Sequence, residues 1–192
     1  GLALFLYGMQ MMSGGLEAAA GNKMKQILEI LTANRFLGVA VGALITAVIQ
    51  SSSASVGILQ TLAKGGLISF SSSVFVLFGM NIGTCITAVL ASIGTNRSAK
   101  RTTIIHLMFN LIGTAIFTVL CLTLPIADFV AAITPGKPDA QIANMHTLFN
   151  IATTLLLIPF GTYLAAAATK ILPDTKEEQE NASILGQLNK EF

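Results

Sequence analysis

Apolar residues dominate the chain in four long windows that contain no Asp, Glu, Lys or Arg. These windows are residues 36–63, 65–96, 102–127 and 140–169. Because a helix that crosses a bilayer needs about 20 mostly apolar residues, each window is long enough for a crossing. Residues 1–20, in which Glu17 is the one charged residue, predict a further membrane helix. The pattern therefore predicts an all-α, polytopic membrane protein with long transmembrane helices.

Further elements follow from the same pattern. In residues 22–34, charged and apolar residues interleave so that one apolar stripe forms, which suits a short helix lying in the membrane interface. Residues 99–124 predict one continuous crossing, and residues 141–168 predict the last crossing. The loop region between them, with a short helix of its own, is marked by Pro125, Pro135 and Pro138. We expect a transmembrane domain over 1–171 and a solvated tail over 172–192.

Two of the windows contain clusters of neutral polar residues. Gln50–Ser53 divides the first window, and Ser71–Ser73 and Asn81–Thr84 interrupt the second. Backbone groups in hydrocarbon must be paired internally, so irregular segments at membrane depth persist only inside protein or beside water. We therefore predict that both windows form broken or re-entrant helices in the interior. For Ser71–Ser73, which precedes an apolar run, helix N-capping is the favoured role.

The Gln50–Ser53 cluster carries the richest chemistry. A half-helix that begins after Ser53 would direct free N–H groups and the positive end of its dipole at an anion. Hydroxyl and carbonyl oxygens on the other side of the break suit a hard cation such as sodium. Discontinuous helices build ion and substrate sites in this way in secondary transporters. The alternative is close helix packing through small residues, the role expected of Gly38, Gly42 and Thr46.

The Asn81–Thr84 cluster, with Thr87 one turn later, is the second predicted break. Gly83 removes the steric barrier to a non-helical turn, and the polar side chains supply oxygens. The alternative is a tolerated kink. If the helix unwinds here, Gly83→Val should be more damaging than Gly42→Ala, because alanine still fits small-residue packing.

A short internal repeat pairs a histidine with an asparagine. His106 and Asn110 recur forty residues later as His146 and Asn150, each pair at i and i+4 and therefore on one helix face. The two long helices would then present similar polar faces to the same interior. Each histidine either binds a neighbouring helix by a hydrogen bond or acts as a ligand or proton relay.

Composition excludes several classes of protein. The chain is 53% hydrophobic and 10% charged, against about 25% charged residues in soluble domains. Its formal net charge is +2, and no basic cluster suits nucleic acid. Cys85 and Cys121 both lie in apolar windows, which argues against a disulfide framework.

An intramembrane hydrolase using Ser51–Ser53 would need an acid or a glycine-flanked nucleophile turn. Neither accompanies them, so we predict that the chain is not an enzyme.

Three motifs in order resemble the sodium-dependent phosphate cotransporter family, which comprises the type II sodium–phosphate symporters and their bacterial relatives. The motifs are Gln50-Ser51-Ser52-Ser53, Asn81-Ile82-Gly83-Thr84 followed by Thr87, and His106-x-x-Phe109-Asn110. The resemblance extends from about Gly1 to Leu172. It implies a multi-pass protein of the bacterial inner (plasma) membrane that moves phosphate together with sodium.

The resemblance also implies where the two solutes bind. Phosphate and sodium are expected at Gln50, Ser51, Ser52, Ser53, Asn81, Gly83, Thr84, Thr87 and Asn110. Secondary candidates are His106, His146 and Asn150. Sodium itself is expected on the oxygens of Gln50, Ser51, Ser52, Ser53, Asn81 and Thr84. It serves as the coupling ion, and no other cofactor is expected.

The chain departs from the family pattern in one respect. The family has two inverted repeats, each with a Gln-Ser-Ser-Ser in a re-entrant hairpin, whereas this chain has one such motif. It resembles a two-repeat protein shortened between its motifs, and its tail resembles the start of a linker to a helical domain. The alternative function is therefore a non-transporting or partial subunit that needs a second motif-bearing chain. A homodimer, a pair with a longer relative and a non-functional fragment all remain open.

Overall fold

The computed structural model describes residues 1–4, 7–8, 11, 15, 30, 33–176 and 179. The expected first membrane helix and the interface helix lie largely outside these residues and stay predictions, as does most of the tail. Within the described residues every regular element is a helix, which confirms the all-α prediction. The elements are α3 (Arg35–Ile49), α4 (Ser52–Lys64), α5 (Phe70–Ala91), α6 (Arg97–Thr123), α7 (Ile126–Ile133), α8 (Pro138–Leu157), the 3-10 helix η1 (Ile158–Phe160) and α9 (Gly161–Ile171).

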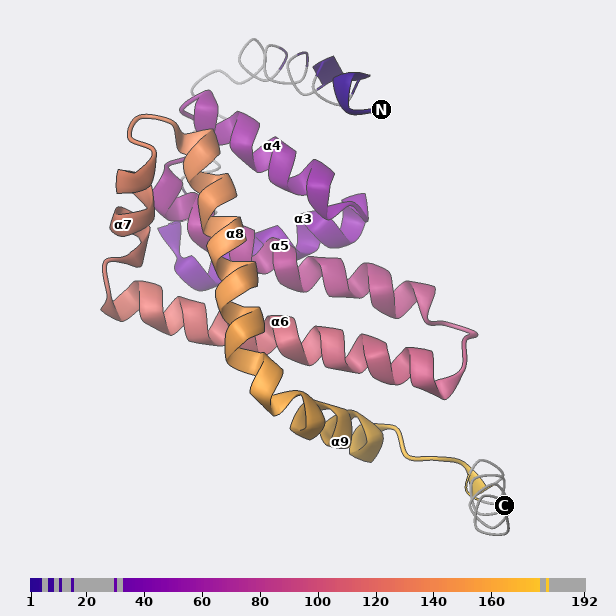
Figure 1. The fold of residues 1–192 in the computed structure, drawn as a ribbon. Helices are drawn as coiled ribbons and strands as arrows, with labels where there is room; N and C mark the ends of the chain where they lie inside the picture. Colours follow the sequence, from indigo (N-terminus) through magenta and orange to yellow (C-terminus); the bar gives the residue numbers. More distant parts are fainter. Residues whose placement is uncertain are drawn as a thin grey trace.

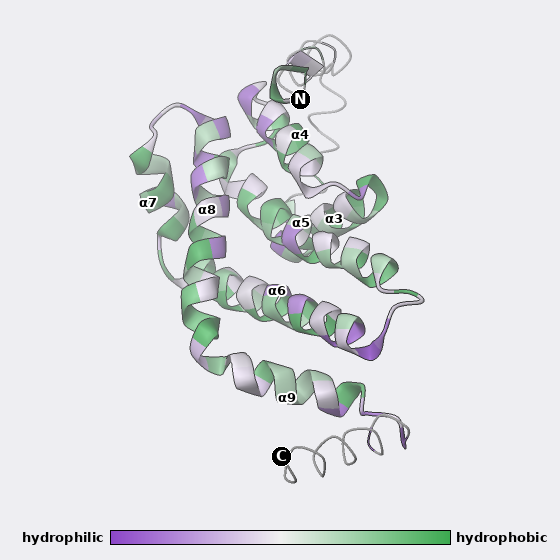
Figure 2. Cartoon of the chain, turned by 45° about the vertical axis from the view of Figure 1, so that its right-hand side comes forward, coloured by the Kyte–Doolittle hydropathy of each residue, from purple (hydrophilic) through white to green (hydrophobic). Residues whose placement is uncertain are grey.

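Three helical segments are long and apolar enough to cross a membrane. They are Phe70–Ala91, Arg97–Thr123 and Pro138–Ile171, and Figure 2 shows hydrophobic residues recurring along each of them. The third contains the crossing expected over 141–168; η1 interrupts its α-helix, and α9 leaves at an angle to α8 (Figure 1). Pro159 lies in η1, where its missing N–H and its ring prevent a regular α-helical turn. The predicted short helix between prolines is α7.

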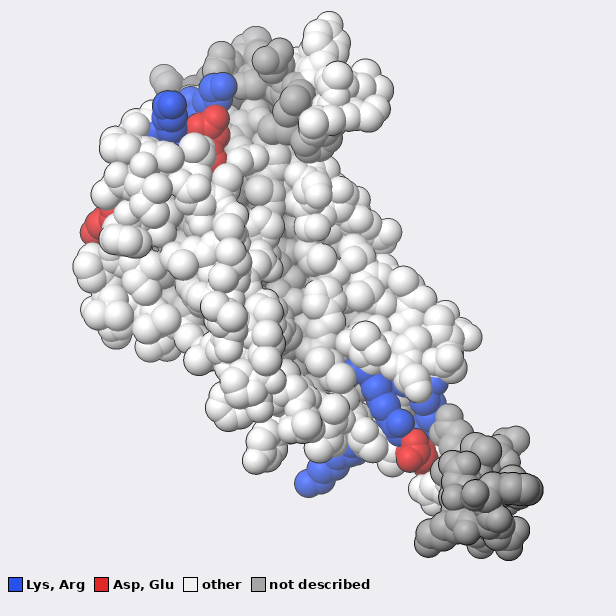
Figure 3. Space-filling view, viewed as in Figure 1, with Lys and Arg blue, Asp and Glu red and all other residues white. Residues whose placement is uncertain are grey.

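Charged side chains gather at two ends of the described structure. Figure 3 shows Lys and Arg at both ends of one face, with a broad uncharged surface between them. At one end lie Arg97, Lys100 and Arg101, in the first turns of α6, and Lys170 near the end of α9. A hydrocarbon layer excludes unpaired charge, so this separation is what a membrane-embedded chain requires.

The helices α3 and α5 are held together by backbone contact. Gly42 and Gly79 face the partner helix so closely that an added Cβ would overlap the carbonyl oxygens of Val76 and Val39, respectively. At Gly83 an added Cβ would lie 2.5 Å from the Ala43 oxygen. Small residues permit this approach in membranes, where association depends on close packing. The packing role expected of Gly38, Gly42 and Thr46 is confirmed, because all three are buried.

The second predicted break is absent, because α5 runs without interruption through the Asn81–Thr84 motif. The glycine in the motif serves the close approach to α3 rather than an unwound turn. For the same reason the expected tolerance of Gly42→Ala is wrong: the space that alanine would need is occupied by backbone. The N-capping role expected of Ser71–Ser73 belongs instead to Ser69, whose Oγ accepts from the Ser72 N–H at 3.2 Å, while Ser71–Ser73 lies in the first turn of α5.

An aromatic cluster joins α5, α6 and α8. The ring of Phe78 lies 5.9 Å from that of Phe117 and 5.3 Å from that of Phe149, centroid to centroid. Thr114 in α6 donates to the Phe78 carbonyl oxygen at 3.3 Å. The helix α4 packs on α5 and α8, and Gln60 donates from α4 to the Asp139 oxygen at 3.0 Å. The core therefore lies between α5 and the helices around it.

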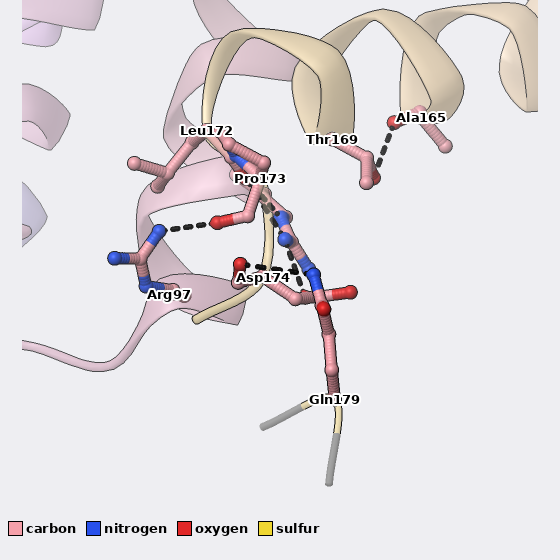
Figure 4. A network of polar contacts seen from close by, with 8 residues as sticks. Arg97, Ala165, Thr169, Leu172, Pro173, Asp174 and Gln179 are labelled. Carbon is pink, nitrogen blue, oxygen red and sulfur yellow. Dashed lines mark hydrogen bonds and ion pairs between the residues drawn. The ribbon is translucent and has the colours of Figure 1, made fainter. Parts of the chain in front are cut away.

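A polar network fastens the start of α6 to the end of α9 (Figure 4). The guanidinium of Arg101 donates to the Leu172 oxygen at 2.8 and 2.9 Å, and to a carboxylate oxygen of Asp174 at 2.6 Å. Arg97 donates to the Pro173 oxygen. Cations near a helix C-terminus offset the negative end of its dipole and pair its open carbonyls. The network therefore orients α9 beside α6.

The backbone contact predicts a sharp glycine dependence. Gly79→Ala should destabilise the protein by about 3 kcal/mol or more, because neither helix backbone can move away without losing its neighbours. The matched control is Gly161→Ala in α9, where an added Cβ meets no atom within 4 Å. That change should be neutral or stabilising by up to about 1 kcal/mol. Thermal unfolding in detergent, followed by circular dichroism, measures both; equal melting of Gly79→Ala and wild type would contradict the packing.

Candidate functional site

The first predicted break is present, between α3 and α4. The helix α3 ends at Gln50, which adopts a left-handed conformation with φ 55° and ψ 26° and donates its N–H to the Thr46 oxygen at 2.8 Å. Ser51 follows in an extended conformation and α4 begins at Ser52. Non-glycine residues rarely adopt positive φ, so this turn is a defined feature of the backbone. At about 1.5 Å per residue each half is too short to cross a bilayer alone.

The first turn of α4 consists of hydroxyl residues. Ser51 is the N-cap, and its Oγ accepts from the Ala54 N–H at 3.3 Å. The N-terminus therefore lies at Ser52 rather than after Ser53, two residues earlier than the sequence suggested. The N–H groups of Ser52 and Ser53 have no intrahelical partner, as at any helix N-terminus. Gln50, Ser51 and Ser53 are exposed and Ser52 is half-buried.

The second motif presents its oxygens from an intact helix. Thr84 donates from Oγ1 to the Met80 oxygen at 2.9 Å, and Thr87 donates to the Thr84 oxygen at 2.6 Å. A hydroxyl that donates to its own helix retains its lone pairs as acceptors. Both side chains are half-buried. They can therefore offer oxygens to a cation without any break in α5.

The parallel register of α3 and α5 brings the two motifs to one level. Contacts ascend together along both helices, from Gly38 at Val76 to Thr46 at Gly83. Continued by one turn of about 3.6 residues, this register predicts that Gln50 lies near the level of Thr87. No hydrogen bond joins Gln50–Ser53 to the Asn81–Thr87 turn within the part of the chain described. The register, not a direct bond, relates them.

One polar residue of this region was assigned to packing alone. Thr46 is fully buried, with an exposed fraction of 0%, and its Oγ1 has no hydrogen-bond partner among the described residues. It lies on α3 one turn before Gln50 and against Gly83 of α5. The one sequence feature that points to this residue is its position four residues before the Gln50–Ser53 motif. Its spacing within a stripe of small residues favours a packing role. Nothing in the sequence indicates that its hydroxyl has no hydrogen-bond partner among the described residues.

The histidine–asparagine repeat has the same local bond twice. Asn110 donates to the His106 oxygen at 3.0 Å, and Asn150 donates to the His146 oxygen at 2.8 Å. The faces are not equivalent, because Asn110 is buried and Asn150 is exposed. His146 reaches α5, where its Nε2 lies 3.1 Å from the Asn81 Oδ1.

Most of the predicted residues therefore fall into two groups. Asn81 and His146 meet between α5 and α8, with Asn81 only 7% exposed. Around the next turn of α5, Cys85 donates weakly to the oxygens of Asn81 and His106 at 3.5 and 3.6 Å. Gln50–Ser53 forms the second group, at the level of Thr87. Asn150 stands outside both, and no bond connects the His106 ring to them within the described residues.

The site is electrically neutral. No charged side chain lies in the windows that carry either motif. Within the described residues no group of three or more His, Cys, Asp or Glu could hold a metal ion. Any ion bound here would be held by neutral oxygens, N–H groups and helix ends. Such ligands suit sodium and oxyanions better than transition metals.

Comparison with known proteins places the chain in context. Residues 4–134 match the family described as Na+/Pi-cotransporter. The chain is 40% identical over 119 residues to the uncharacterized protein YqeW of Bacillus subtilis, covering 62% of this chain and 38% of YqeW. It is 28% identical over 182 residues to the putative inorganic phosphate export protein YjbB of Escherichia coli, covering 92% of this chain and 32% of YjbB.

A mammalian relative is also similar over part of the chain. The sodium-dependent phosphate transport protein 2A of Rattus norvegicus is 31% identical over 94 residues, which is 48% of this chain and 15% of that protein. The chain thus spans well under half the length of each of these relatives. No solved structure matches it.

The left-handed turn predicts an unusual effect of glycine. Gln50→Gly should leave stability unchanged or raise it by up to about 1 kcal/mol, because glycine adopts positive φ without steric cost. The control is the same replacement in a regular helix: Gln60→Gly, in α4, should lower stability by about 1 kcal/mol or more. Urea unfolding in detergent compares them. If Gln50→Gly costs as much as Gln60→Gly, the turn is not left-handed.

Proposed function

The chain belongs to the Na+/Pi-cotransporter family, and from that premise we propose that it binds phosphate and sodium at the α3–α4 break and moves them together across the membrane. The observation that carries the proposal is the register of α3 and α5. Its last close contact, between Thr46 and Gly83, lies one turn before Gln50, so its continuation would bring the serine-rich N-terminus of α4 near the level of Thr87.

Phosphate would be held without a cationic side chain. The open N–H groups at the start of α4, the hydroxyls of Ser51–Ser53 and the Gln50 amide are the available donors. A helix N-terminus attracts an anion through these N–H groups and its dipole. Neutral donors bind an anion less firmly than arginine does, and this weaker binding favours release in a transport cycle.

Sodium would take the acceptor oxygens and offset the charge of phosphate. Thr84 and Thr87 keep lone pairs free of their intrahelical bonds. Thr46 adds a buried hydroxyl beside them. Because each ion then improves the electrostatic environment of the other, binding of the two is expected to be mutually reinforcing.

The direction of transport depends on the gradients. YjbB is named as a putative phosphate exporter and protein 2A as a sodium-dependent transporter. A symporter runs either way, so the two names are compatible with one mechanism. We propose net phosphate movement down the combined sodium and phosphate gradients.

The central test is Ser52→Ala. Loss of the hydroxyl in the first turn of α4 should reduce sodium-dependent phosphate uptake by at least tenfold, because a ligand to phosphate or sodium is removed. The measurement is radiolabelled phosphate uptake into proteoliposomes that contain only the purified chain, with an inward sodium gradient. The control is Ser98→Ala, at an exposed serine of α6, which should transport normally. Unchanged sodium dependence and phosphate affinity after replacing Ser51, Ser52 and Ser53 together would refute the site.

A second function is favoured by the single motif. One Gln-Ser-Ser-Ser segment stands where the family has two, and its exposed side chains would face lipid if nothing covered them. Unpaired polar groups in hydrocarbon cost several kcal/mol each, by order of magnitude. The chain would then be a partial subunit that completes its site with another motif-bearing chain. A second copy, inserted in the opposite orientation, is the simplest such partner.

Cysteine crosslinking tests the dimer. In a background where Cys85 and Cys121 are replaced by serine, Ser52→Cys should crosslink between copies in membranes if motif meets motif. Lys170→Cys, far along the chain at the end of α9, is the control and should stay monomeric. A chain that remains monomeric and still transports phosphate would overturn the half-site argument. A monomer without transport would indicate a non-functional fragment.

A further inference from the structure

The pair formed by Asn81 and His146 contains an unused donor. Asn81 is 7% exposed, and its Oδ1 lies 3.1 Å from the His146 Nε2. Its Nδ2 is buried and has no hydrogen-bond partner among the described residues. Leaving a buried amide N–H unpaired costs roughly 1–3 kcal/mol. Native proteins retain such groups mainly where a ligand or a functional need explains them.

The chemistry of the contact fixes the direction of the bond. An amide oxygen only accepts, so the proton lies on His146 Nε2, which donates to Asn81 Oδ1. This bond holds the carboxamide in one orientation and leaves the N–H groups of Nδ2 without a partner among the described residues. The hydrogen bond to Asn81 on α5 therefore determines which ring nitrogen of His146 carries the proton.

We propose that His146 is a positioning residue, which holds the Asn81 amide so that its N–H groups donate to an oxygen of the transported oxyanion. This inference rests on the proposed function and adds a donor on α5 to those on α4. It divides the motif by chemistry: Asn81 supplies N–H donors suited to a phosphate oxygen, while Thr84 and Thr87 supply acceptor oxygens suited to sodium.

The surroundings favour this division. The other buried asparagine, Asn110, donates its Nδ2 to the His106 oxygen at 3.0 Å, so that its amide is already engaged. His146 is held in place by its neighbours: its own carbonyl accepts from Asn150, and Phe149, one turn on, stacks against Phe78. Phe78 lies one turn before Asn81. The aromatic contact therefore fixes the spacing of α5 and α8 at which the polar pair meets.

The pair itself is tested by nuclear magnetic resonance. The chain has two histidines, so His106→Gln leaves His146 as the single histidine signal. In protein labelled with ¹⁵N-histidine, Nε2 should carry the proton, and Asn81→Leu should shift that resonance. An unprotonated Nε2 would overturn the proposal, because the amide would then be held the other way round.

The effect on the site is tested by binding and transport in the same preparation. His146→Leu should weaken phosphate binding by about tenfold, because one donor is no longer oriented, while the sodium affinity measured without phosphate stays unchanged. His146→Gln, which can donate from a similar position, should restore most of the affinity. In an Asn81→Leu background, His146→Leu should have no further effect, since it acts through Asn81.

Three outcomes separate the two proposals. Wild-type protein that binds no phosphate refutes the proposed function and this inference with it. Wild-type protein that binds phosphate, with His146→Leu unchanged, refutes the inference alone. A loss of sodium affinity with phosphate affinity preserved also overturns it, because Asn81 would then act as a cation ligand through oxygen.

Discussion

The backbone contact between α3 and α5 is the constraint on which the rest of the structure depends. Gly42 and Gly79 allow the two helices to approach until carbonyl oxygens occupy the space that side chains would fill. That contact fixes both the spacing and the register of the pair. The position of Gln50 relative to Thr87, and hence the geometry of the candidate site, follows from it. In a membrane, where the hydrophobic effect does not drive helices together, close packing of this kind supplies much of the association energy.

A neutral site follows from the location of the polar residues. Charged side chains gather at the two ends of the structure (Figure 3), where Arg101 fastens α9 to α6. Between those ends the polar groups are hydroxyls, amides, imidazoles and helix termini. In the proposed site, the donors are at the start of α4 and on Asn81, and the acceptors are on the threonines of α5. An anion and a cation can therefore be bound close together without any charged residue being buried.

The structure decides between two roles for the glycine of the second polar motif. Gly83 lies in a polar motif, and a glycine there is equally consistent with an unwound turn and with close helix contact. The motif sequence does not distinguish them, because both need the absence of a side chain. The contact with Ala43 and Thr46 on α3 decides for packing. The break that does occur, at Gln50, uses no glycine at all.

Residue order alone was enough to deduce the all-α class, the membrane location, the α6 crossing, the short helix between prolines and the interruption at Gln50–Ser51. These features depend on local composition: hydrophobic runs longer than a bilayer, prolines that stop helices and a polar cluster that cannot sit in lipid. Only the tertiary structure shows three further features. They are the pairing of His146 with Asn81, the Thr46 hydroxyl without a partner among the described residues, and the register of α3 against α5. Each depends on which helix lies against which and at what depth, and residues 65 positions apart along the chain leave no local pattern that records their contact.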